Sequence, residues 1–139
     1  IGPAEAALSF LVFFALLDAG GWQWAQPLAS DALLYGQATG AFLATIMFCQ
    51  IGNVLACRSN RLSALPYLLR PNLWIWAGLL VEVLFILAIL YIPLFHRFFS
   101  TGPLPLWVWG IIALAPWLIF GIEELRKWLV RRGVQWLAV

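Results

Sequence analysis

Long apolar stretches separated by short polar segments dominate the sequence. The most continuous one runs from Gly40 to Cys57, close to the ~20 residues with which a helix crosses the hydrocarbon core of a bilayer. Gln50 and Asn53 interrupt it three positions apart, on one face of a helix, and Arg58 ends it. Amide side chains in hydrocarbon are costly unless they form hydrogen bonds. The pattern therefore predicts a membrane helix whose polar seam faces other helices or water.

Three further apolar stretches complete the pattern. In the first, Glu5 and Asp18 lie near the helix ends and are expected at the membrane interface. They enclose a core of only about a dozen apolar residues, which is short for a membrane span. The third stretch is interrupted by Glu82, and the fourth contains Pro116, which should kink its helix. We therefore predict an all-α membrane protein with short loops. It forms a single transmembrane helical domain, with spans over residues 4–22, 39–57, 73–94 and 106–121.

The basic residues lie mainly where these helices end. The segment 20–37, with Trp22, Trp24, Pro27 and Asp31, has no Lys or Arg, and the segment 96–105 has Arg97 alone. Because basic loops stay in the cytoplasm, both termini are expected there. The residues that anchor this topology are Arg58, Arg61, Arg70, Arg126, Lys127, Arg131 and Arg132.

The segment that begins at Gly121 predicts an amphipathic helical end. Its four basic residues, Arg126, Lys127, Arg131 and Arg132, should face the anionic inner leaflet. Glu123 and Glu124 precede them at helical spacings, which favours local salt bridges.

Composition agrees with the membrane class. The 139 residues are 64% hydrophobic and 10% charged, far outside the soluble range. The net charge of +2 reflects orientation signals, so nucleic acid is not expected as a partner. The start at Ile1 lacks the features of a removable secretory signal and suggests a piece of a longer chain.

Catalytic and redox motifs are absent from the sequence. There is no phosphate loop, no HExxH and no GxSxG, and His96 has no partners for a triad or a metal site. Cys49 and Cys57 would lie roughly 12 Å apart along one helix, too far for a disulfide. We expect no catalytic residue and no cofactor in this chain.

Glu82 lies near the middle of its span, where an ionisable group usually faces a cavity and serves ions, protons or substrates. The alternative is a protonated carboxyl that hydrogen-bonds neighbouring helices. Together with Gln50 and Asn53 it could form an oxygen-rich site for a hard cation. These three residues are therefore the candidates for the ion pathway and for metal binding, although the two amides are equally compatible with helix packing.

Three segments read MFCQIGNVLACRSNRLS, PNLWIWAGLLVEVLF and PLWVWGIIALAPWLIFGIEELRKWLVRRG. They resemble the carboxy-terminal part of P-type cation-pumping ATPases of the calcium and sodium/potassium type. The run from Pro116 to Arg132 is the most specific. The resemblance covers essentially the whole chain, as the last four of that family's ten membrane helices.

The resemblance implies an ion-translocating membrane domain. Gln50 and Asn53 stand where family members place oxygens near the transported ions, and Glu82 resembles the helix-nine glutamate that sodium/potassium pumps use near an additional sodium site. Calcium pumps with two sites have an acidic residue at the position of Gln50, and sodium/potassium pumps have an aspartate at that of Asn53. These departures suggest fewer or different ions.

The leading hypothesis is a support domain that scaffolds and partly lines the ion pathway of an ATP-driven cation pump in the plasma membrane. The phosphorylation motif D-K-T-G-T is absent, so this chain should not pump alone, and ATP and Mg²⁺ are implied only for a full-length pump. The expected partners are the lipid bilayer, the cation, and the remaining membrane helices and cytoplasmic domains. The alternatives are a small independent transporter of ions or protons that self-associates around Glu82, and a non-transporting assembly subunit.

Overall fold

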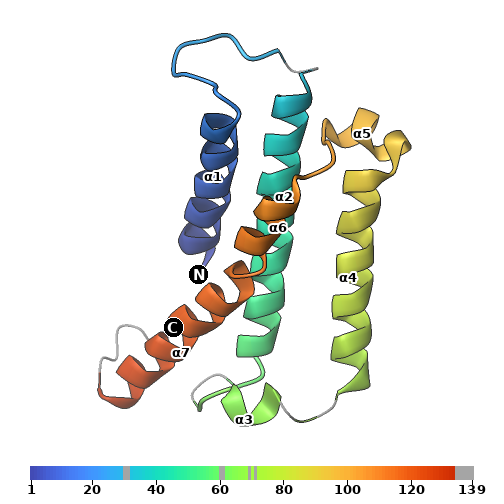
Figure 1. The fold of residues 1–139 in the computed structure, drawn as a ribbon. Helices are drawn as coiled ribbons and strands as arrows, with labels where there is room; N and C mark the ends of the chain where they lie inside the picture. The colour runs from blue at the N-terminus through green and yellow to red at the C-terminus, as the bar shows by residue number, and fades with distance from the viewer. Residues whose placement is uncertain (30–31, 60–61, 69, 71, 134–139) are drawn as a thin grey trace.

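Seven helices and no strand make up the described part of the chain in a computed structural model, shown in Figure 1. This part covers residues 1–29, 32–59, 62–68, 70 and 72–133. The helices are α1 (Gly2–Ala19), α2 (Leu33–Ala56), α3 (Leu65–Leu68), α4 (Leu73–Tyr91), α5 (Pro93–Phe99), α6 (Leu106–Ile112) and α7 (Ala115–Arg131).

Four segments are long and apolar enough to cross a membrane: α1, α2, α4, and α6 together with α7 over Leu106–Arg131. The predicted all-helical fold with four spans is confirmed. The second span begins at Leu33, earlier than residue 39, and the fourth continues to Arg131 instead of ending at residue 121.

The third helix begins as expected and ends early. The side chain of Asn72 accepts hydrogen bonds from the backbone N–H groups of Trp74 and Ile75, which caps the start of α4. The helix ends at Tyr91 instead of residue 94, because a residue before proline avoids the helical conformation and Ile92 is extended (φ −90°, ψ 119°). Pro93 then opens α5, a short helix that begins inside the span predicted to end at residue 94 and continues into the short loop expected over residues 96–105.

The last span is broken at the position where a kink is expected. Its first half, α6, ends at Ile112, four residues before Pro116, and α7 starts at Ala115. Proline has no N–H to donate, and its ring collides with the carbonyl four residues earlier. In Figure 1, α7 leaves the direction of α6 and runs obliquely across the lower half of the molecule.

Helix α2 is the centre of the bundle, in contact with α1, α4, α6 and α7. Small residues on α2 let its neighbours approach closely, as in other membrane bundles. Ala38, Ala41 and Ala44 are completely buried in a core that also contains residues of α1, α4 and α6. At Gly52 the backbones of α2 and α7 meet, since a Cβ atom there would lie 2.8 Å from Cα of Pro116.

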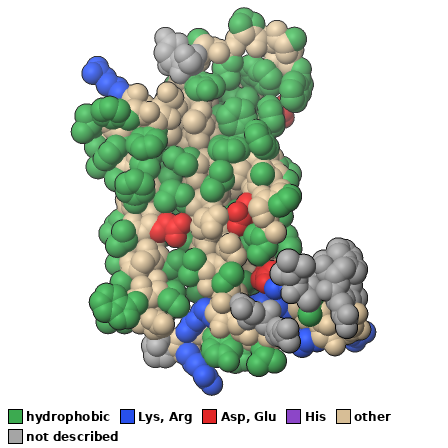
Figure 2. Space-filling view, turned by 180° about the vertical axis from the view of Figure 1, so that it is seen from behind, with side chains coloured by type: hydrophobic (Ala, Val, Ile, Leu, Met, Phe, Trp, Pro, Cys, Tyr) green, Lys and Arg blue, Asp and Glu red, His purple; other side chains and the backbone are tan. Residues whose placement is uncertain are grey.

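On the face that Figure 2 shows, hydrophobic side chains are spread over most of the height of the molecule, with acidic side chains among them near the middle. On α4, Leu80, Val81, Leu84 and Phe85 are all more than half exposed. Such a surface suits contact with lipid chains, which do not penalise exposed apolar groups. The fold is that of a multi-pass membrane protein.

Candidate functional site

The polar seam of α2 faces a residue that the sequence pattern placed elsewhere. The amide Nε2 of Gln50 donates a hydrogen bond to Oε2 of Glu5 on α1, at 3.0 Å. One turn further along α2, Oδ1 of Asn53 accepts a hydrogen bond from the thiol of Cys57, at 3.3 Å. Gln50 thus joins two helices, whereas the hydrogen bond between Asn53 and Cys57 stays at the carboxy-terminal end of α2.

Glu5 lies inside the bundle, although its place near a helix end favoured an interfacial position. Its side chain is 9% exposed, and Oε1 has no hydrogen-bond partner within the described residues. Glu5 and Ser9 belong to the buried stripe of α1 that continues through Val12 and Leu16. This helical spacing is a signal in the sequence that could have placed Glu5 in the interior.

Glu82 lies on the side of α4 that packs against the bundle. Leu79 and Ile86, three residues before and four residues after it, are both buried, and residues at these spacings share a helical face. Glu82 itself is partly buried, and the described residues include no hydrogen-bond partner for it. Near Leu79, a hollow of about 260 Å³ opens between α2, α4 and the last span, lined by Phe48, Ile51, Leu55 and Pro116 among others.

The three predicted ion-pathway residues are therefore not joined to one another. In the described structure, hydrogen bonds connect Gln50 to Glu5 and Asn53 to Cys57, and none connects either amide to Glu82. The described residues also contain no group of three His, Cys, Asp or Glu side chains that could hold a metal ion. The roles of Gln50, Asn53 and Glu82 in ion binding stay predictions.

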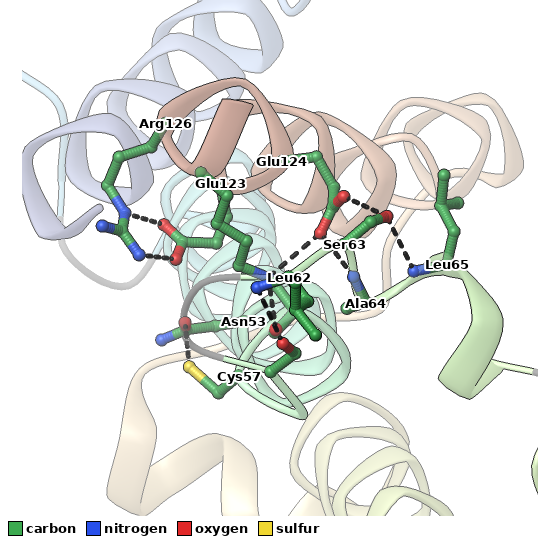
Figure 3. A network of polar contacts seen from close by, with 12 residues as sticks. Asn53, Cys57, Leu62, Ser63, Ala64, Leu65, Glu123, Glu124 and Arg126 are labelled. Carbon is green, nitrogen blue, oxygen red and sulfur yellow. Dashed lines mark hydrogen bonds and ion pairs between the residues drawn. The ribbon is translucent and has the colours of Figure 1, made fainter. Parts of the chain in front are cut away.

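A second polar cluster joins the end of α2 to α7, as Figure 3 shows. Glu124 accepts hydrogen bonds from the hydroxyl of Ser63 (2.5 Å) and the backbone N–H of Ala64 (2.9 Å), and it pairs with Lys127 (3.0 Å). The ammonium of Lys127 also donates to the backbone carbonyl of Ala56 in the last turn of α2, at 2.8 Å. A cation bonded to the last carbonyls of a helix is favourable there.

The prediction that Lys127 faces the inner leaflet is wrong. Its side chain is completely buried because it reaches inward to α2. The predicted local salt bridges are confirmed, between Glu124 and Lys127 and between Glu123 and Arg126, whose atoms come within 2.5 Å. Glu123 is buried as well, so this end of α7 contributes charged groups to the interior.

The arginines at the α3 end of the molecule contact backbone carbonyls or an aromatic ring. Arg58 donates hydrogen bonds to the backbone carbonyls of Tyr67 and Arg70, and the guanidinium of Arg132 lies 4.0 Å from the centre of the Trp128 ring. Figure 2 shows Lys and Arg side chains gathered at this end of the molecule. Arg61 and Asp31 lie outside the described residues.

The other residues considered for chemistry are Cys49, Cys57 and His96. Cys49 is buried and Cys57 is exposed, and neither forms a disulfide, in agreement with the prediction. A ring nitrogen of His96 lies 2.8 Å from the carbonyl of Leu90, so this residue ties α5 to the end of α4.

A comparison with known protein families shows the family to which the chain belongs. Four apolar helices, a broken last span, and carboxyl and amide groups between the helices define a multi-pass membrane domain with polar groups in its interior. The sequence profile of the family described as "Cation transporting ATPase, C-terminus" matches residues 1–129. The chain belongs to this family, and it is the carboxy-terminal membrane region of a cation-transporting ATPase. A comparison with curated protein sequences gives no match.

Proposed function

We propose that this domain scaffolds and partly lines the ion pathway of an ATP-driven cation pump of the calcium or sodium/potassium type. The observation that carries the proposal is the packing of α2. This helix contacts every other span and carries Gln50 and Asn53 within the bundle. Amide oxygens on such a helix can bind a cation that has lost part of its hydration shell.

Glu82 would supply the negative charge. It lies on the inward stripe of α4 beside Leu79 and Ile86, and no cation among the described residues pairs with it. A carboxylate in that position attracts a positively charged ion more strongly than neutral amides do. We propose that Gln50 and Asn53 offer oxygens from α2 and that Glu82 offers its carboxylate from α4 when the remaining pump helices are present.

We propose that ATP and Mg²⁺ act in other parts of a full-length pump. The sequence has no D-K-T-G-T motif and no phosphate loop, so we assign nucleotide binding and phosphoryl transfer to the remaining parts of a full-length pump. We also propose that those parts, with their own membrane helices, are the direct partners of this domain in the plasma membrane.

The test is ATP-dependent cation uptake by the full-length pump in liposomes, with calcium and sodium supplied separately. Gln50→Ala, Asn53→Ala and Glu82→Gln should each lower the apparent cation affinity by about tenfold, which corresponds to ~1.4 kcal/mol. Gln23→Ala is a matched control because it removes an amide from an exposed loop. Its affinity should equal that of the unchanged protein.

Two results would replace the proposal. Full transport and unchanged affinity in the Gln50, Asn53 and Glu82 triple variant would make these residues structural, as expected for an assembly subunit. Cation or proton flux through this chain alone, without ATP and lost on Glu82→Gln, would identify an independent transporter.

A further inference from the structure

Helix α5 turns away from α4 and lies across that end of the bundle, as Figure 1 shows. Two side chains hold this turn by bonding to the last carbonyls of α4, which have no partner within the helix. A ring nitrogen of His96 lies 2.8 Å from the carbonyl oxygen of Leu90. The hydroxyl of Thr101 donates to the carbonyl oxygen of Ile89, at 3.1 Å. These two contacts fix α5 and the turn that follows it against α4.

The end of α4 has the aromatic side chains that are typical of a membrane–water interface. Tyr91 is the last residue of α4, and its hydroxyl accepts a hydrogen bond from the indole N–H of Trp109, at 3.0 Å. Tyr and Trp are enriched at both membrane interfaces, because each joins an apolar ring to a polar group. Helix α5 starts at Pro93, directly beyond this pair. It therefore begins at the level of the lipid headgroups.

The surface of α5 combines exposed apolar side chains with a cation. Leu94 and Phe98, four residues apart and so on one face of the helix, are 63% and 76% exposed. Arg97 is exposed as well, and no hydrogen bond or ion pair joins its side chain to another described residue. Every other Lys or Arg of the sequence lies within residues 58–70 or 126–132. Arg97 is therefore remote in the sequence from all other basic residues.

A hollow of about 450 Å³ opens beside Arg97, between α5, the turn after it and the start of α2. Arg97 and Ser100 line one side of it, and Leu33 and Gly36 of α2 line the other. The two sides meet where the backbone N–H of Gly102 donates to the carbonyl oxygen of Gly36, at 2.9 Å. Among the described residues, no Asp or Glu lines the hollow. It therefore has a positive charge and no described counter-charge.

We propose that this hollow binds the phosphate group of an anionic phospholipid in the leaflet that borders α5. The guanidinium of Arg97 offers two parallel N–H donors to phosphate oxygens, and the hydroxyl of Ser100 offers a further donor to the headgroup. The acyl chains of the same lipid cover Leu94 and Phe98 on the adjoining face of α5. The scarcity of basic residues in the loops at this end predicts that this leaflet is the outer one.

The arrangement favours a phospholipid over a soluble anion, because the cationic hollow adjoins an exposed apolar face. A soluble anion would contact Arg97 and leave Leu94 and Phe98 uncovered, whereas a lipid covers both features at once. An anionic headgroup also fits better than a zwitterionic one, since no described carboxylate lines the hollow to receive an ammonium group. This inference does not depend on the ion pathway, because none of the residues assigned to that pathway lines the hollow.

Photocrosslinking of the full-length pump in phosphatidylcholine vesicles tests the site. The vesicles contain a little phosphatidylglycerol with a photoreactive acyl chain, and mass spectrometry maps the labelled peptides. Residues 92–105 should be labelled, and Arg97→Gln should lower this labelling about fivefold, as expected for the loss of one basic residue beside anionic lipid. Arg97→Lys keeps the charge and should keep most of the labelling. Arg132→Gln is the matched control, because Arg132 is an exposed arginine of the last segment, and it should leave the labelling of residues 92–105 unchanged.

Three results would overturn the proposal. The first is equal labelling of residues 92–105 in Arg97→Gln and in the unchanged protein. The second is equal labelling of the unchanged protein by photoreactive phosphatidylcholine, which would mean that α5 contacts lipid without recognising an anionic headgroup. This comparison needs no variant, so it decides the question even if Arg97→Gln fails to fold. The third is loss of labelling with inorganic phosphate but not with chloride at equal ionic strength, which would identify a soluble anion as the ligand.

Discussion

Two carboxyl groups, the buried Glu5 and the partly buried Glu124, differ in how completely their oxygens are bonded. Glu124 on α7 has donors at both oxygens and a cation at 3.0 Å. Glu5 on α1 has one amide donor, and its second oxygen has no partner in the described part of the chain. A fully bonded buried network rigidifies a structure, whereas an unsatisfied buried group usually has another role. The contacts of Glu124 therefore account for its position, whereas one oxygen of Glu5 still has an open bonding position.

The largest effect is expected from removing the cation of the satisfied cluster. Lys127→Met leaves Glu124 and the carbonyl of Ala56 without their buried donor, and breaking a buried pair typically costs about 3–5 kcal/mol. Denaturant-induced unfolding in detergent measures this loss. Arg132→Met is the matched control, because Arg132 is exposed and stacks on Trp128, and it should cost less than ~1 kcal/mol. Equal losses in the two variants would show that the cluster does not stabilise the fold.

A smaller effect is expected at the close contact between α2 and α7, the helix that carries Glu124. Gly52→Ala would place a methyl group 2.8 Å from Cα of Pro116, so α7 must shift away from α2 at a cost of about 1–3 kcal/mol. Gly78→Ala is the matched control, since a Cβ atom there meets nothing within 4 Å. Within a helix it should stabilise by about 0.5–1 kcal/mol. The unfolding free energies of both variants check this pair, and a neutral Gly52→Ala would contradict the close approach.

The third prediction concerns the outer ion pair of α7. Arg126→Lys keeps the charge and loses the two-pronged contact with Glu123. Because the Arg126 side chain is 27% exposed, the change should cost only ~0.2–1 kcal/mol and should shrink at high salt. Unfolding at low and high salt gives the comparison. A large loss of unfolding free energy that does not depend on salt would mean that this pair stabilises the fold as the buried Lys127 cluster does.

The smallest change in stability is expected at Glu5. Glu5→Gln exchanges an incompletely bonded carboxyl for an amide of the same shape, so the free energy of unfolding should change by less than ~1 kcal/mol. Unfolding under the conditions used for Lys127→Met tests the contrast directly. A loss comparable to that of Lys127→Met would mean that Glu5 stabilises the fold as Glu124 does.

Several features followed from local patterns in the sequence. Four apolar runs predicted four spans, Pro116 predicted the break in the last one, and the spacings of Glu123 and Glu124 predicted their ion pairs. The boundaries were less accurate where turn chemistry intervened, as at Pro93, which ended α4 at Tyr91. Each success depends on residues that are neighbours along one helix, so no knowledge of the other helices was needed.

The hydrogen-bond partners of the polar residues did not follow from local patterns in the sequence. Gln50 was expected to share a site with Glu82, yet its hydrogen bond goes to Glu5, 45 positions away. Lys127 was expected at the membrane surface, yet it reaches Ala56, 71 positions away. A pattern that compares residues one or two helical turns apart cannot predict contacts between residues so far apart along the chain.

The sequence by itself determined how often the chain crosses the membrane and where its last helix breaks, because apolar length and proline chemistry act locally. Only the tertiary structure decided which polar groups meet. Helices that are apolar on nearly every face carry no strong signal for their rotation about their own axes. That rotation is set by close contacts such as Gly52 against Pro116, which exist only once the helices have packed.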